Sequence, residues 1–137
     1  MGYSYTFTCQ SCHHRQKLYE GWGFMVHDQP AKDYLLSQPV SLHYRTHQKI
    51  VKLSQQYPDL ELKMEYRIYR CRHCLQISDK LFVQLISDGK VLHKTRFRCS
   101  NCQTSLKHTN ILRLKYAICP KCKSQQFKKE KELVLWN

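Results

Sequence analysis

The 137-residue sequence has no long apolar run, no leader-like start and no recognisable catalytic motif. Its apolar stretches reach only a few residues, as at 81–83, so we expect no membrane-spanning helix and no membrane partner. The first residues lack a basic region followed by an apolar stretch, which argues against a secretory signal. Motifs of serine hydrolases and P-loop enzymes are absent, and the acidic residues are too scattered to form a catalytic cluster. These absences predict a soluble, cytoplasmic protein that is not an enzyme.

Acidic residues are missing from one long stretch of the chain. The sequence carries 23 Lys and Arg against 10 Asp and Glu, which gives a formal net charge of +13. Residues 89–137 alone hold a net charge of +10, against +3 for residues 1–88. The 41 residues from 89 to 129 contain no acid at all. Because ordinary protein surfaces mix both signs, this asymmetry indicates a polyanionic ligand.

The cations of the acid-poor half are candidate contacts to nucleic-acid phosphates. Several Lys and Arg that displace counterions give affinity without reading a base sequence. The candidates are Lys94, Arg96, Arg98, Lys107, Arg113, Lys115, Lys121 and Lys123. We expect a nucleic acid of undetermined type as the partner. Two alternatives stay open, namely docking onto an acidic protein partner without nucleic acid, and a basic surface that only aids solubility.

The sequence contains 8 cysteines, and all of them belong to four C-x-x-C pairs. The pairs are Cys9 with Cys12, Cys71 with Cys74, Cys99 with Cys102, and Cys119 with Cys122. Two such pairs supply the four thiolates of a tetrahedral metal site, so we expect two Zn²⁺ ions per chain. Sites saturated with sulfur keep no open position for a catalytic water, which again argues against an enzyme.

Other uses of the cysteines are possible. A disulfide framework needs an oxidising compartment and usually a shorter chain. A redox dithiol at Cys119 and Cys122 needs a helix N-terminus to lower the thiol pKa, but residues 124–129 show no helical period. Iron can occupy a site of four thiolates, although zinc is the commoner structural occupant.

The spacing between the pairs favours one assignment of ligands to ions. Sixteen residues separate Cys102 from Cys119, a spacing typical of a single zinc site. This assigns the last two pairs to one ion and leaves the first two pairs, separated by residues 13–70, to the other. The alternative joins the second and third pairs and leaves the outer two pairs together.

Secondary-structure patterns surround the cysteine pairs. Alternation of apolar and polar residues predicts strands at 3–7, 60–68 and 112–118, each just before a C-x-x-C pair. The dipeptide Asp88-Gly89 predicts a hairpin within 81–98, since it favours a two-residue turn. Strands that run into cysteine turns are what a zinc ribbon requires.

Residues 30–57 follow a helical pattern instead. Ile50 and Leu53 lie on one face of a helix that is expected to begin near Ser41 and to end before Pro58. We expect its apolar face to pack on the N-terminal sheet.

The four cysteine turns with strands between them resemble the zinc-ribbon superfamily, the rubredoxin-like knuckle fold, and in particular small uncharacterised bacterial proteins with two zinc ribbons. The resemblance also rests on the stretch 21–24 and on the apolar residues 133–136. The resemblance implies a zinc-ribbon fold that binds zinc. Proteins with this fold use it to bind nucleic acid or to dock onto other proteins. Family knuckles often place a glycine after the second cysteine, where the backbone takes a positive φ. The residues at that position here are His13, Leu75, Gln103 and Lys123.

These observations predict a small α+β protein that is mostly β. We expect two four-cysteine zinc ribbons in contact, with a helical insertion at about 30–57 between the ligand pairs of the first ribbon. The expected domains are 1–80, the first ribbon with its insertion, and 81–137, the strongly basic second ribbon.

Overall fold

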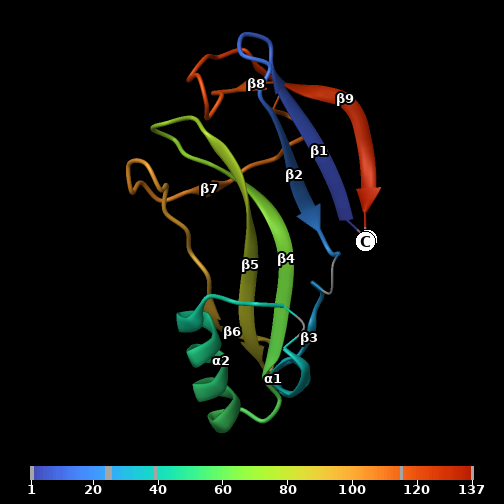
Figure 1. The fold of residues 1–137 in the computed structure, drawn as a ribbon. Coiled ribbons are helices and arrows are strands. Elements are labelled where there is room, and N and C mark those ends of the chain that lie inside the picture. Colours follow the sequence, from blue (N-terminus) through green and yellow to red (C-terminus); the bar gives the residue numbers. More distant parts are fainter. Residues whose placement is uncertain (1, 24–25, 39, 115, 137) are drawn as a thin grey trace. The chain divides into compact units, whose positions relative to one another are not determined.

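The computed structural model describes residues 2–23, 26–38, 40–114 and 116–136. These residues form a small, mostly antiparallel β structure with two helices, as expected from the sequence (Figure 1). The chain divides into two compact units. Unit 1 consists of Met1–Gly21, Tyr66–Lys80 and Arg96–Asn137. Unit 2 consists of Trp22–Glu65 and Leu81–Thr95. Each unit therefore draws on segments from both sides of residue 80, the sequential boundary that we expected.

The sheet of unit 1 is built around the N-terminal strand. Its strands are β1 (Gly2–Cys9), β2 (Arg15–Gly21), β8 (Tyr116–Ala117) and β9 (Phe127–Trp136). Strand β1 pairs antiparallel with β2 on one side and with β9 on the other, and β8 pairs with β9. The β1–β9 register places Cys9 opposite Phe127. The two ends of the chain thus meet in one sheet.

Strand β4 (Glu61–Arg70) continues this sheet. Gly21 of β2 pairs with Tyr66, and the short strand β7 (Lys107–His108) pairs with Tyr69 and Arg70 at the end of β4. The strict alternation that predicts this strand is confirmed, because Leu62, Met64 and Ile68 are all buried. A long strand with one buried face needs this period of two.

The core of unit 1 contains cysteines as well as large apolar side chains. Its buried members are Tyr5, Phe7, Cys9, Leu18, Ile68, Ile77, Ile111, Ala117, Cys119 and Phe127. The rings of Phe7 and Phe127 lie 5.4 Å apart between their centroids. Burial of Cys9 and Cys119 within this cluster means that ligand residues are also packing residues.

The strand expected at 112–118 is mostly absent. Leu112 is 71% exposed, and the β pairing is limited to β8. A turn precedes it, in which the Leu114 N–H donates to the Ile111 carbonyl at 3.2 Å. The turn points Ile111 and Leu114 at the core, a spacing of three that replaces the alternation of a strand.

The expected hairpin is present. Strand β5 (Ile77–Ser87) pairs with β6 (Lys90–Lys94), and Ser87 lies opposite Lys90. The two loop residues both have positive φ, 51° at Asp88 and 74° at Gly89. This is the backbone that a type I′ turn requires, and it explains why the dipeptide was informative.

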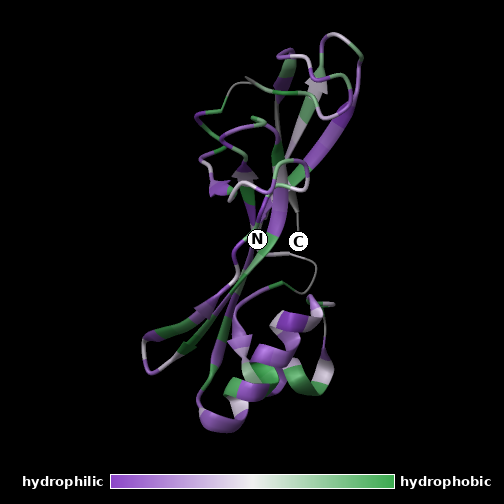
Figure 2. Ribbon diagram, turned by 90° about the vertical axis from the view of Figure 1, so that its left-hand side faces the viewer, coloured by the Kyte–Doolittle hydropathy of each residue, from purple (hydrophilic) through white to green (hydrophobic). Residues whose placement is uncertain are grey.

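The two helices belong to unit 2. They are α1 (Ala31–Ser37) and α2 (Tyr44–Gln56), preceded by the short strand β3 (Gln29–Pro30). Helix α2 carries both hydrophilic and hydrophobic residues (Figure 2), and Ile50 on this helix is buried, as expected. Neither helix in the described part of the chain has the length and apolar character needed to cross a membrane.

Helix α2 begins later than the sequence pattern predicts. Its N-cap is His43, and the side-chain Nδ1 of His43 accepts a hydrogen bond from the Arg45 backbone N–H at 3.2 Å. Ser41 therefore does not cap it. The ring nitrogen takes the role expected of the serine hydroxyl, since either can accept from a free N–H of the first turn.

Candidate metal sites and a basic cleft

The four C-x-x-C pairs adopt the same tight turn. In the first pair, the Cys9 N–H donates to the His14 carbonyl at 2.8 Å, and the His13 N–H donates to the Cys9 carbonyl at 2.9 Å. The other three pairs repeat both hydrogen bonds, at 2.8–3.0 Å. The hydrogen bonds that define this turn join residues no more than five positions apart, so its geometry is set by a short stretch of chain.

The residue after each second cysteine has a left-handed backbone. The φ values are 64° at His13, 61° at Leu75, 62° at Gln103 and 63° at Lys123. The missing glycines therefore do not change the geometry of the turns. A left-handed conformation costs a residue with a β-carbon about 1–2 kcal/mol. Two such residues per metal site cost less than the roughly 10–16 kcal/mol that a structural zinc ion supplies.

Replacing one of these residues with glycine is expected to stabilise the protein. Gln103 is a suitable position, because its side chain is exposed. We expect Gln103→Gly to exceed Gln103→Ala in stability by about 0.5–1 kcal/mol, since both variants lose the side chain but only glycine removes the β-carbon. Denaturant midpoints at a fixed metal concentration would measure this difference. Equal midpoints for the two variants would show that the turn stores no strain.

The eight cysteines gather into two groups of four. The outer site consists of Cys9, Cys12, Cys119 and Cys122. The inner site consists of Cys71, Cys74, Cys99 and Cys102. In each site all four sulfurs lie within 4.8 Å of one another, and none of the eight cysteines forms a disulfide bond. Both groups belong to unit 1.

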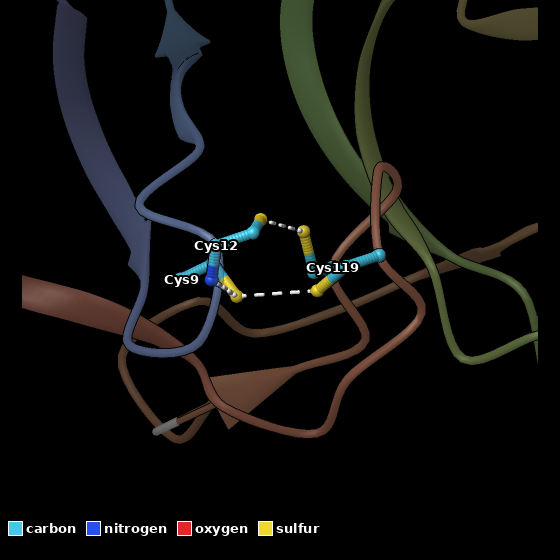
Figure 3. A group of neighbouring side chains, drawn as sticks. Cys9, Cys12 and Cys119 are labelled. Atoms are coloured by element: carbon cyan, nitrogen blue, oxygen red, sulfur yellow. Dashed lines mark hydrogen bonds between the residues drawn. The ribbon is translucent and has the colours of Figure 1, made fainter.

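Sulfur-to-sulfur distances test whether the sites suit a metal. In the outer site Cys9 to Cys122 is 3.5 Å and Cys12 to Cys119 is 3.7 Å. Figure 3 shows the sulfurs of Cys9 and Cys12 directed toward the turn that carries Cys119. A tetrahedron with metal–sulfur bonds of about 2.3 Å has edges of about 3.8 Å, whereas a disulfide bond is about 2.05 Å long. The arrangement fits a four-coordinate ion and does not fit a disulfide framework.

The inner site has the same dimensions. Cys71 to Cys102 is 3.5 Å, and Cys74 to Cys99 is 3.9 Å. Polar groups surround its sulfurs, since Asn101 Nδ2 donates to Cys74 Sγ at 3.3 Å. Contacts of this kind orient thiolate ligands and favour their charged form.

Hydrogen bonds and crowding act on the thiols of the outer site in opposite directions. The Cys12 backbone N–H donates to Cys9 Sγ at 3.4 Å and is the largest cause that lowers the pKa of Cys9 to about 6. At Cys122 the Ser124 backbone N–H lowers the pKa, but burial and the neighbouring thiols outweigh it and raise the pKa to about 12. Four thiols this close do not all ionise by themselves. A bound divalent cation would supply the positive charge that they lack.

The ligand assignment favoured by spacing is wrong, and the alternative pairing is observed. The outer site joins the first and last pairs because β9 pairs with β1. The inner site joins the second and third pairs because β7 pairs with the end of β4 and places Lys107 opposite Arg70, next to Cys71. The helices consequently lie between pairs of different sites, and not between the two ligand pairs of a first ribbon. Pairing of strands from distant parts of the chain overrides the local spacing rule.

Charge is divided between the units even more unevenly than between the halves of the sequence. Unit 1 holds 16 Lys and Arg against 4 Asp and Glu, a net charge of +12, and unit 2 holds 7 against 6, a net of +1. A site of four thiolates with one divalent ion carries −2, so two filled sites leave unit 1 at about +8. The same unit therefore combines the metal ligands with nearly all of the net positive charge.

The structure places the eight candidate cations in different surroundings. Lys107 and Arg113 line one cleft. Arg96, Arg98 and Lys121 are exposed elsewhere in unit 1, and Lys123 is exposed with its Nζ donating to the Pro120 carbonyl at 3.1 Å. Lys94 is exposed on β6 and belongs to unit 2, whereas the other candidates belong to unit 1. Lys115 lies outside the described residues. Of the seven candidates within the described residues, Lys107 and Arg113 are the two that line this cleft.

Two further cations complete this cleft. It has a volume of about 660 Å³, and its lining also includes Arg70 and Arg72 beside the inner site. We refer to it below as the basic cleft. Neither arginine was among the candidates from the sequence, because residues 1–88 as a whole are nearly neutral. The sequence did contain a signal for them, since Arg70 and Arg72 flank Cys71. Pairing the second and third cysteine pairs at one metal site would have brought these arginines near the acid-free residues 89–129.

No protein-family model matches the chain, and no match was found among curated proteins or solved structures. The function is therefore inferred from the residues themselves.

Proposed function

We propose that this chain is a zinc-ribbon protein in which two structural Zn²⁺ ions hold a basic surface that binds nucleic acid. Zinc is the proposed occupant because four-thiolate tetrahedral sites in proteins usually hold it, and because the observed sulfur spacings suit its bond lengths. The role is structural, since four sulfurs fill the coordination shell of each ion and leave no position for a reacting water.

The observation that carries the proposal is the concentration of charge in unit 1. A net charge of +12 on the unit that carries both metal sites creates a positive field, and it remains positive after the metal correction. A polyanion of closely spaced phosphates is the ligand that gains most from such a field, because each contact releases counterions. Arg15 and Glu130 form an ion pair at 3.3 Å, but unit 1 holds only 4 acidic residues against 16 Lys and Arg, so intramolecular pairing can neutralise only a minority of this charge.

Nucleic-acid binding is testable by charge reversal with a matched control. We expect Arg96→Glu/Arg98→Glu/Arg113→Glu to weaken binding of a labelled oligonucleotide by roughly tenfold or more, because three favourable phosphate interactions become repulsive. Fluorescence anisotropy at about 50 mM and about 200 mM salt would measure the affinity and its salt dependence. The three residues are exposed, so the variant is expected to fold.

The control reverses the same number of charges in unit 2. Lys32, Lys49 and Lys52 are exposed there, and changing all three to Glu is expected to alter affinity by less than about threefold. Equal losses in the two triple variants would mean that only overall charge matters. Absence of binding in the unchanged protein, together with capture of one stoichiometric acidic protein, would favour the docking alternative.

A further inference from the structure

The basic cleft gathers four cations of unit 1 around one hollow. Four cations line it, namely Arg70, Arg72, Lys107 and Arg113, and none of its lining residues is acidic. Arg70 and Arg72 come from the end of β4 and the turn that follows, and Lys107 comes from β7, which pairs with β4 (Figure 1). The volume of about 660 Å³ lies within the range typical of ligand-binding clefts.

Arg70 has an unsatisfied donor in this cleft. Its Nε is buried and has no hydrogen-bond partner among the described residues. Buried side-chain donors are nearly always paired in native proteins, so this donor needs an acceptor that the described residues do not supply. An anionic oxygen is the strongest acceptor for a guanidinium group.

The negative charge of a filled inner metal site is too small to balance the four cations of the basic cleft. Four thiolates and one divalent ion carry −2, which two cations would neutralise. Two positive charges then remain in the cleft, in a unit with a large excess of the same sign. A ligand bearing more than one negative charge would complete the balance.

A smaller apolar recess shares walls with the basic cleft. This cavity of about 120 Å³ is lined by Arg70 and Leu75, which also line the cleft, and by Ala117, Ile118 and Gln125. The Ile118 N–H donates to the Leu75 carbonyl at 3.4 Å, which joins the two sides of the recess. A planar ring suits such a space, and the Gln125 amide offers both a donor and an acceptor to a ring edge.

We propose that the basic cleft binds single-stranded nucleic acid, with a backbone phosphate on the four cations and one base in the recess beside them. This inference rests on the proposed function and specifies its ligand and its site. A base in a duplex is stacked and paired, and must be extruded before it can enter a recess, whereas a single strand presents it freely. The cleft therefore selects single strands over duplexes.

The test compares two double variants that differ only in position. Arg72 and Arg113 are exposed at the cleft, and Arg96 and Arg98 are exposed elsewhere in unit 1. For a single strand of about 12 nucleotides, we expect Arg72→Glu/Arg113→Glu to lose roughly 30-fold in affinity and Arg96→Glu/Arg98→Glu less than about fivefold. The salt slope of the cleft variant should fall by about 0.7 for each phosphate that is no longer neutralised. Equal losses in both variants would overturn the assignment of the cleft.

Three ligands complete the experiment. A duplex of the same sequence is expected to bind more weakly than the single strand. An abasic strand is expected to bind roughly tenfold more weakly, because no base then fills the recess or lies against the Arg70 guanidinium. Tighter duplex binding, or an abasic strand that binds equally well, would overturn the proposal. So would a mononucleotide that binds as tightly as the strand. If no nucleic acid binds the unchanged protein, the proposed function fails as well, whereas binding that ignores the cleft variant removes only this inference.

Discussion

Replacing two cysteines of the same metal site is expected to leave one bound ion per chain, whereas replacing one cysteine from each site is expected to leave none. Cys9→Ser/Cys119→Ser damages only the outer site and should retain one ion per chain. Cys9→Ser/Cys71→Ser damages both sites and should retain none. The spacing-based assignment predicts the reverse for both variants. Each lost ion corresponds to about 10–16 kcal/mol of apparent binding free energy, so the two outcomes are far apart.

Native mass spectrometry with elemental analysis would count and identify the ions. The unchanged protein is expected to hold two zinc ions, and the control Cys71→Ser/Cys102→Ser should hold one, because both residues belong to the inner site. The inner site can persist without the outer one, since its ligands span a short segment from 71 to 102. Retention of one ion by the Cys9/Cys71 variant would contradict the observed pairing.

Chelation of the metal is expected to unfold unit 1. All eight ligands lie in this unit, and Cys9 and Cys119 belong to its buried core together with Phe7 and Phe127. Two structural sites at about 10–16 kcal/mol each exceed the stability of an ordinary domain, about 5–15 kcal/mol. Without the ions, the crowded thiols would also lose the charge that allows them to ionise together.

Circular dichroism and amide hydrogen exchange on the full chain would follow this unfolding. We expect loss of β-sheet signal and of exchange protection at Phe7, Leu18 and Phe127, all fully buried in unit 1, and recovery of both when zinc is added back. Native spectra and unchanged protection in the metal-free protein would show that apolar packing alone maintains the fold.

Features that depend on neighbouring residues could be predicted well. The Asp88-Gly89 turn follows from the ease with which these residues adopt positive φ, and the structure has it. The alternation over 60–68 predicts β4 because a half-buried strand needs that period. The four C-x-x-C turns also form from local hydrogen bonds, even where the residue after the second cysteine is not glycine.

Features that depend on strand pairing could not be predicted in the same way. The first and last cysteine pairs meet because β1 and β9 lie side by side, and no local pattern encodes which distant strand becomes a neighbour. The same limitation hid the basic cleft, because Arg70 and Arg72 join Lys107 only when β7 pairs with β4. The strand prediction at 112–118 failed for a related reason, since core packing of Ile111 overrode an alternating pattern.

The amino-acid sequence by itself determined the chemistry of this protein: eight paired thiols able to hold two metal ions, and an excess of positive charge. Residue types and short-range spacing carry that information because ligation and charge belong to the side chains themselves. Only the tertiary structure decided which thiols share an ion and where the charge collects. Long-range strand pairing gathers both metal sites and a net charge of +12 into unit 1, and leaves unit 2 at +1.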